Sequence, residues 1–303
     1  MGEMLFLACH LLLSLALIIA SLSHLFFSSV AHLSPAHTNN HGFRILRHPL
    51  FRILPVLAAL PFPFLPIAPT SRLLPFTLLP PLLLLLPLPF LPVNHLPLLR
   101  PLFLSLPLFL QARAVGLLTD AFPVSDLQVH TLSIATLLLI TAATTSLVST
   151  LSQSRTTHHL LAETLFTFVG IVGGLWALQS GLNLYIDSCV PAGCHRLMDT
   201  TLAPATRCDV DEARLQAIAF MDVMLSVHCL IAATLVSGLH LGVAKRYGVD
   251  GGGVNIGMGT GRRHNGIGGS YDALPMVPLS SGTIEETEHL PVKGVIGKAV
   301  AQE

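Results

Sequence analysis

The strongest constraint in this sequence is a run of 116 residues, from position 4 to position 119, that contains neither aspartate nor glutamate. Six arginines are the only fully charged side chains in that run. A soluble domain carries charges at about a quarter of its positions, whereas this chain carries them at 11% and has a mean hydropathy of +0.70. The sequence therefore predicts an all-α, polytopic integral membrane protein whose main partner is the lipid bilayer.

Apolar stretches of about 20 residues are long enough to cross a bilayer as helices. Seven such spans are predicted, and they form one transmembrane domain at residues 1–244. The predicted spans are residues 4–28, 50–68, 73–92, 96–118, 130–151, 162–186 and 213–244. A cleaved signal peptide is the alternative for the first span, but the segment lacks a basic leading region and exceeds the usual apolar length.

Prolines interrupt the second, third and fourth predicted spans, because 15 of them fall between positions 49 and 107. Each proline removes a backbone hydrogen bond from a helix, and neighbouring helices in a membrane can satisfy only some of the freed carbonyls. We therefore expect these three spans to be kinked. Low-complexity drift of a plain apolar segment explains the prolines better than any function does.

The C-terminal residues 245–303 differ in composition from the rest of the chain. They hold all three lysines and 13 of the 23 glycines, with no Phe or Trp, so they are predicted to be a disordered cytoplasmic tail. With a cytoplasmic C-terminus, nine basic residues near span ends lie in the cytoplasm and five lie outside. The positive-inside rule favours this orientation. The 16 acidic and 16 basic residues balance, so no nucleic-acid partner is predicted.

Polar side chains at membrane depth usually face the inside of a helix bundle and often mark functional positions. The candidates in the predicted helices are His10, His24, His130, Gln179, Asp222 and His228. The alternative is that the histidines only join helices by hydrogen bonds. Because an unpaired carboxylate is costly in hydrocarbon, we expect Asp222 to meet a histidine of the first span.

No catalytic residue is predicted, because the chain contains no Ser-His-Asp, Walker or dinucleotide-binding signature. The alternative function is an intramembrane metal or haem protein with redox or hydrolase chemistry. Met221, Met224 and His228 share one helix face, and thioether and imidazole groups can hold copper or haem iron. Methionine at this spacing is more often part of a packed core, so no cofactor is predicted.

Small residues line one face of the sixth predicted span. Gly170, Gly174 and Gly181 lie on this face, and the first two form a Gly-x-x-x-Gly motif. Such a face allows the backbone of another helix to approach closely. We therefore predict that another helix packs on this face. If that helix belongs to another subunit, the protein forms a homo-oligomer or hetero-oligomer through this span.

Three cysteines, Cys189, Cys194 and Cys208, follow the sixth predicted span. In the predicted orientation this loop lies outside the cytoplasm, where disulfides persist. We predict one bridge, with three possible pairings. Free thiols, or a zinc site that adds His195, are the alternatives.

Several motifs carry a family resemblance. Trp176-Ala-Leu-Gln179-Ser-Gly181-Leu-Asn-Leu184-Tyr185 is the longest, and shorter ones are His24-Leu25-Phe26, Asp126-Leu127-Gln-Val-His130, Arg207-Cys208-Asp209 and Met221-Asp222. Together they resemble the transmembrane protein 45 family, especially its plant members, over residues 1–30 and 124–244. The resemblance implies a seven-helix membrane protein of no established activity, associated in plants with responses to infection or herbivory.

Overall fold

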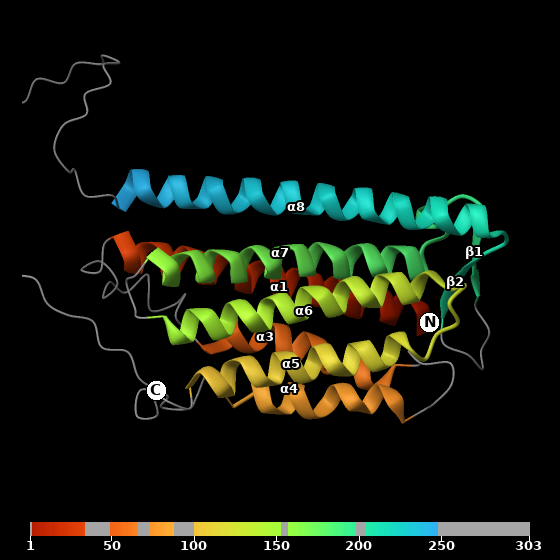
Figure 1. Ribbon diagram of the computed structural model, residues 1–303, viewed down its shortest axis with the longest axis horizontal. Helices are drawn as coiled ribbons and strands as arrows, with labels where there is room; N and C mark the ends of the chain where they lie inside the picture. The colour runs from red at the N-terminus through yellow and green to blue at the C-terminus, as the bar shows by residue number, and fades with distance from the viewer. Residues whose placement is uncertain are drawn as a thin grey trace, which may run out of the picture. The chain divides into compact units, whose positions relative to one another are not determined.

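The computed structural model describes residues 2–33, 49–65, 73–87, 100–152, 157–197 and 204–247, and most of these residues are helical. The α-helices are α1 (Gly2–Leu33), α3 (Pro49–Ala59), α4 (Leu79–Leu85), α5 (Arg100–Thr119), α6 (Leu127–Leu151), α7 (Thr157–Tyr185) and α8 (Asp211–Tyr247) (Figure 1). Short 3-10 helices are η2 (Phe62–Phe64), η3 (Leu74–Leu78) and η5 (Asp187–Cys189). Two strands, β1 (Cys194–Leu197) and β2 (Ala205–Cys208), form a hairpin before α8.

Four of these helices, α1, α6, α7 and α8, are long and apolar enough to cross a membrane. They coincide with the spans predicted at residues 4–28, 130–151, 162–186 and 213–244. The charges at the two ends of α8 suit a long helix, because Asp211 and Glu212 lie in its first turn and Lys245 and Arg246 in its last. The chain is therefore an integral membrane protein with an all-α fold. The tail predicted to be disordered lies outside the described residues from position 248 onward.

The proline-rich part of the chain forms shorter elements. The helix α3 has 11 residues and continues into η2, whereas η3 leads into the seven residues of α4. Pro55 lies inside α3 and Pro107 inside α5, which has 20 residues. Repeated loss of backbone donors explains why the predicted spans 50–68 and 73–92 are broken up here. Seven membrane crossings are therefore not confirmed.

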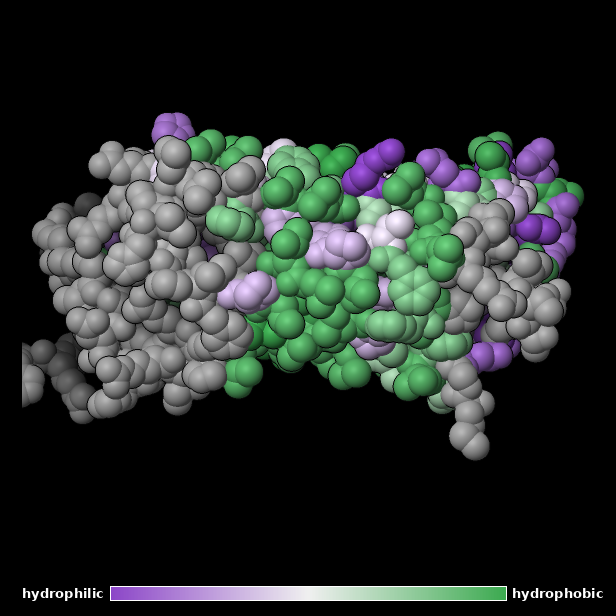
Figure 2. All heavy atoms as spheres, turned by 90° about the horizontal axis from the view of Figure 1, so that it is seen from below, coloured by the Kyte–Doolittle hydropathy of each residue, from purple (hydrophilic) through white to green (hydrophobic). Residues whose placement is uncertain are grey.

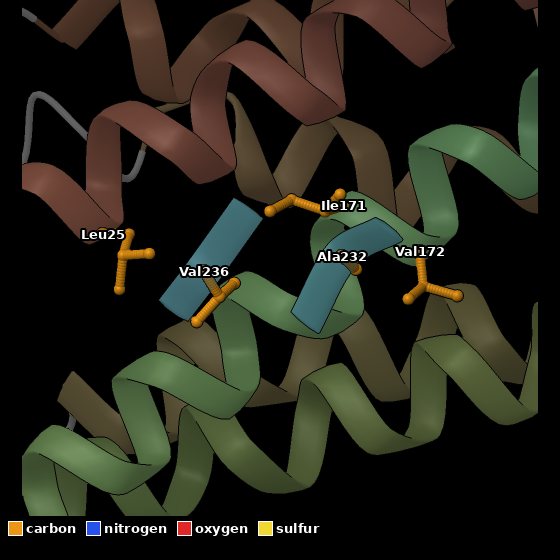
Figure 3. Close-up of a cluster of buried hydrophobic side chains, with 5 residues drawn as sticks. All are labelled: Leu25, Ile171, Val172, Ala232 and Val236. Carbon is orange, nitrogen blue, oxygen red and sulfur yellow. The ribbon is translucent and has the colours of Figure 1, made fainter. Parts of the chain in front are cut away.

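The helix α7 lies at the centre of the bundle. It packs along α1, while α8 lies beside both of them and α6 packs between α7 and α5 (Figure 1). Buried side chains from α1, α7 and α8 meet in one core cluster, which consists of Leu25, Ile171, Val172, Ala232 and Val236 (Figure 3). A second core cluster surrounds Trp176, whose side chain is 2% exposed and whose Nε1 donates to the carbonyl of Thr131.

The outer surface of the bundle is apolar. Hydrophobic residues fill the middle of the face seen in Figure 2, and hydrophilic residues gather toward the end that carries the hairpin. On α8, Leu230 and Leu241 are about 70% exposed. Contiguous exposed apolar surface of this kind is typical of a protein that lies in lipid.

The glycines of α7 form the surface on which α1 packs. A Cβ atom added at Gly174 would lie 3.0 Å from the carbonyl oxygen of Ser14, and one added at Gly181 would lie 2.6 Å from the Cβ of His10. At Gly170 an added Cβ would overlap the hydroxyl of Ser21. The glycine face therefore serves packing within the chain. An oligomer through this helix stays a prediction, and α1 already covers the glycines on which it relied.

A disulfide joins the two strands of the hairpin, and an ion pair holds the hairpin to the bundle. A disulfide joins Cys194 to Cys208, which face each other across the two antiparallel strands, and Cys189 is free. Asp126, at the start of α6, is 4% exposed and accepts a hydrogen bond from Arg207 Nε at 2.8 Å. This carboxylate raises the pKa of the Arg207 guanidinium further above its usual value.

Candidate binding cavity

The helices line an elongated cavity of about 1010 Å³ that is partly open to the outside. Each of the α-helices described above contributes side chains to its walls, most of them apolar. Lining residues occur along most of α7, and those from Glu163 to Asn183 alone are twenty residues or about 30 Å apart at 1.5 Å per residue. The cavity is large enough for a small organic ligand, whose sites usually measure about 300–1,000 Å³.

One end of the cavity carries a group of hydrogen-bonded polar side chains, here called the Glu163 cluster and defined as Glu163, His24, Ser149 and His159. Glu163 Oε2 is hydrogen-bonded to His24 Nε2, and Ser149 Oγ donates to Glu163 Oε1. His159 Nδ1 lies 2.9 Å from the carbonyl oxygen of Ser149. The cluster therefore joins α1, α6 and α7 at the end of the bundle opposite the hairpin.

The Glu163 cluster is largely shielded. The Glu163 side chain is 15% exposed, that of His24 is 33% exposed, and Ser149 is buried. All four residues line the cavity, and Glu163 is the one Asp, Glu, Lys or Arg among its described lining residues. A charged group in this position acts on whatever occupies the cavity, because water screens it only weakly there.

The hairpin end of the cavity is lined by amides. Gln128 Oε1 accepts a hydrogen bond from the Thr206 backbone nitrogen at 2.9 Å, and Gln179 Nε2 donates to Asn183 Oδ1 at 3.3 Å. Asn183 is 6% exposed and its Nδ2 has no hydrogen-bond partner among the described residues. Gln111 Oε1, on α5, also lines the cavity and is a second buried atom without a hydrogen-bond partner among the described residues. Buried polar atoms without partners are costly and need an explanation, such as water or a ligand.

The predicted polar residues lie in several separate places. His10 and His24 both line the cavity, and the His10 ring meets Phe62 edge to face and Tyr185 at a tilt, with ring centroids 4.9 and 5.6 Å away. Gln179 finds its partner on its own helix. The prediction that Asp222 meets a histidine of the first span is wrong, because its carboxylate lies 2.9 Å from His130 of α6.

His228 is 7% exposed, and its ring meets Trp176 edge to face at 6.3 Å. Its Nδ1 atom has no hydrogen-bond partner in the described part of the chain. Those described residues also contain no group of three or more His, Cys, Asp or Glu side chains that could hold a metal ion. His228 therefore lies in an apolar core beside Met221, and the predicted absence of a cofactor stays a prediction.

Sequence reasoning missed Glu163, the residue at the centre of the polar cluster. Two signals pointed to it: it is the one fully charged residue between positions 157 and 186, and it follows His159 at i, i+4, which places both on one helix face. Gln128 was also missed, because a glutamine at the start of an apolar helix has no distinguishing periodicity. Its role arises from a hairpin about 78 residues away in the sequence.

A comparison with known families finds a domain described as "Family of unknown function (DUF716)" at residues 110–241. This family includes the transmembrane protein 45 proteins. A search of curated proteins finds no match. The matched region runs from α5 into α8 and contains Glu163, Gln128 and Asn183.

Proposed function

We propose that this multi-pass membrane protein binds a lipid-soluble organic molecule in the cavity between its helices. One observation carries the proposal: an apolar cavity of about 1010 Å³ has polar groups concentrated at its two ends. Ligand sites are typically concave and mostly apolar, with a few polar groups that orient the ligand. The unpartnered Asn183 Nδ2 and Gln111 Oε1 support the same proposal, since a ligand or water molecules would satisfy them.

We also propose that the chain is a plant-type member of the transmembrane protein 45 group, with seven spans and a cytoplasmic C-terminus. The motif from Trp176 to Tyr185 and the excess of basic residues on that side support this assignment. The Cys194–Cys208 disulfide supports the orientation, because it would then lie outside the cytoplasm. The role in responses to infection or herbivory, which the resemblance implies, stays a prediction.

The proposal is tested with a photoreactive probe and a variant that fills the cavity. Gly173 lines the cavity, and a Cβ atom added there meets nothing within 4 Å. Gly173→Phe should therefore occupy the cavity without disturbing the contact between α1 and α7. The matched control is Gly238→Phe on α8, where an added Cβ also meets open space on the exposed side of the helix.

The probe is a long-chain alcohol that carries a diazirine and an alkyne, added to the full chain in lipid nanodiscs. We expect saturable labelling of peptides from α6 and α7 in the wild type and in Gly238→Phe, and at least a tenfold loss in Gly173→Phe. Equal labelling of all three proteins would show that the probe reacts from the surrounding lipid, and the proposed function would then be wrong.

A further inference from the structure

The charge of the cavity lining restricts the kind of molecule that it can accept. Glu163 is the one fully charged residue among the described lining residues, which include no lysine or arginine. A carboxylate or phosphate head group would meet no permanent positive charge there, and it would face the carboxylate of Glu163. In a site that is poorly screened by water, this charge favours a cationic head group.

The hydrogen bonding of Glu163 leaves room for such a head group. An ionised carboxylate has about four acceptor positions, and His24 Nε2 and Ser149 Oγ occupy one on each oxygen. An ammonium group carries three donors and forms strong, charge-assisted hydrogen bonds with a carboxylate. It can therefore bind Glu163 beside His24, or compete with the imidazole for the same oxygen.

The remainder of the cavity suits a hydrocarbon chain. Between the Glu163 cluster and Trp176 the lining is dominated by apolar side chains, among them Leu17, Leu138, Phe166 and Val169. From Glu163 the lining extends about 30 Å along α7, so the cavity is long for its volume. A linear chain fills such a space better than a compact ring system does.

We infer that the cavity takes a cationic amphiphile, a long-chain primary amine whose ammonium group binds Glu163 and whose chain lies along α7 toward Trp176. This inference rests on the proposed function, because it names the class of molecule that the same cavity binds. It adds that Glu163 recognises the head group and that His24 competes with the ammonium group for the Glu163 carboxylate.

The test measures the competition of three ligands with the photoreactive alcohol on the full chain in nanodiscs. The ligands are octadecylamine, octadecanol and stearic acid, which share one chain length and differ in the head group. We expect the amine to compete at least tenfold more strongly than the alcohol and the acid. In Glu163→Gln the ratio of amine competition to alcohol competition should fall to about one.

A second variant changes amine binding in the opposite direction. His24→Gln keeps a hydrogen-bond donor but cannot carry a positive charge, so the ratio of amine competition to alcohol competition should rise at least threefold. This variant, together with the ratio of amine to alcohol in the wild type, decides the question if Glu163→Gln binds none of the ligands because it fails to fold.

The two proposals fail in different ways. Equal competition by the amine and the alcohol, with no effect of Glu163→Gln, would overturn the assignment of a cationic ligand and leave the binding cavity standing. Strongest competition by stearic acid would overturn it as well. If none of the three ligands reduces labelling by the photoreactive alcohol, and Gly173→Phe does not change that labelling, both proposals are overturned.

Discussion

The Nε2 atom of His130 lies 2.9 Å from the Oδ1 atom of Asp222, and this contact joins α6 to α8. The pair lies near the outer surface of the bundle, since the Asp222 side chain is 57% exposed and that of His130 is 24% exposed. Neighbouring residues of the same helix, Val223 and Val227, are exposed and apolar. The carboxylate is therefore held by an imidazole close to exposed apolar side chains.

We expect Asp222→Leu to reduce stability less than Asp222→Lys. Leucine removes a half-exposed pair, which is worth at most about 1 kcal/mol, whereas lysine places an unpaired ammonium among apolar side chains at a cost of about 2 kcal/mol or more. Thermal unfolding in detergent measures the difference. The same two substitutions at Glu212, exposed in the first turn of α8, serve as the control. Equal stability of both Asp222 variants would place this residue in water or among lipid head groups.

The packing of α1 on the glycines of α7 gives a prediction with an internal control. Gly174→Ala brings a Cβ atom to 3.0 Å from the Ser14 carbonyl and 2.8 Å from Ile18 Cγ1, so we expect a loss of about 1–3 kcal/mol. Gly173→Ala meets open space and should be neutral or slightly stabilising, because alanine favours the helix. Thermal unfolding of the two variants side by side checks the expectation. If they are equally stable, α1 does not pack on this face.

The disulfide predicts that Cys194 and Cys208 react with alkylating reagents differently from Cys189. Mass mapping without reduction should find one linked peptide pair, Cys194 with Cys208, and alkylation should reach Cys189 without prior reduction. Cys208→Ser should lower stability by about 2–4 kcal/mol, since the bridge closes a 14-residue separation. Cys189→Ser is the matched control and should have little effect. A linked peptide that contains Cys189 would contradict the pairing.

Asp126 and Asp187 both face an arginine, but only the first is buried. The Asp126 side chain is 3% exposed and that of Asp187 is 83% exposed. Asp126→Asn should therefore cost about 2 kcal/mol or more, because Arg207 loses a buried hydrogen-bonded partner, whereas Asp187→Asn should change little. Denaturation of the purified full chain compares the two variants.

The same ion pair has a defined dependence on pH. Asp126 raises the pKa of Arg207 above its already high unfolded value. The resulting stabilisation is complete below the unfolded pKa and is lost only as the pH rises through the folded pKa, and both lie far above the physiological range. Arg207 should therefore contribute no pH dependence between about pH 6 and pH 9. Guanidinium chloride unfolding at several pH values, in the wild type and in Arg207→Gln, should give parallel curves across this range. Curves that converge or cross there would show another titrating partner.

Orientation is tested with tags at Met1 and Glu303. An odd number of spans with a cytoplasmic C-terminus predicts that protease added to the cytosolic side removes the C-terminal tag and spares the N-terminal one. Identical behaviour of the two tags would require an even number of crossings. The broken helices α3 and α4 would then be the elements that do not cross.

The sequence was sufficient to locate the long helices, because an apolar run of more than 20 residues has few alternatives in lipid. It could not settle the proline-rich region, where each proline removes a donor and the outcome depends on which neighbour accepts the freed carbonyl. The disulfide pairing also depended on structure, because it follows from the strand register that places Cys194 opposite Cys208.

The partners of the polar side chains inside the bundle could not be predicted from the sequence either. Helical periodicity placed His24 on an inward face, but the identity of its partner depends on how α1 and α7 are rotated against each other. Glu163 is 139 residues away in the sequence, and no local pattern connects the two. Hydroxyl groups of α6 likewise bond to carbonyls of their own helix, at Thr131, Ser133, Thr136, Thr141, Thr144, Thr145 and Thr150.

The glycine contact between α1 and α7 also affects which helices can move when the cavity changes volume. Backbone and side-chain atoms already touch along that seam, so separating the two helices even slightly would forfeit many contacts at once. The helices α3 and α5, which also line the cavity, contain Pro55 and Pro107, where helical hydrogen bonds are already missing. Bending α3 and α5 therefore costs fewer contacts than separating α1 from α7 when the cavity changes volume.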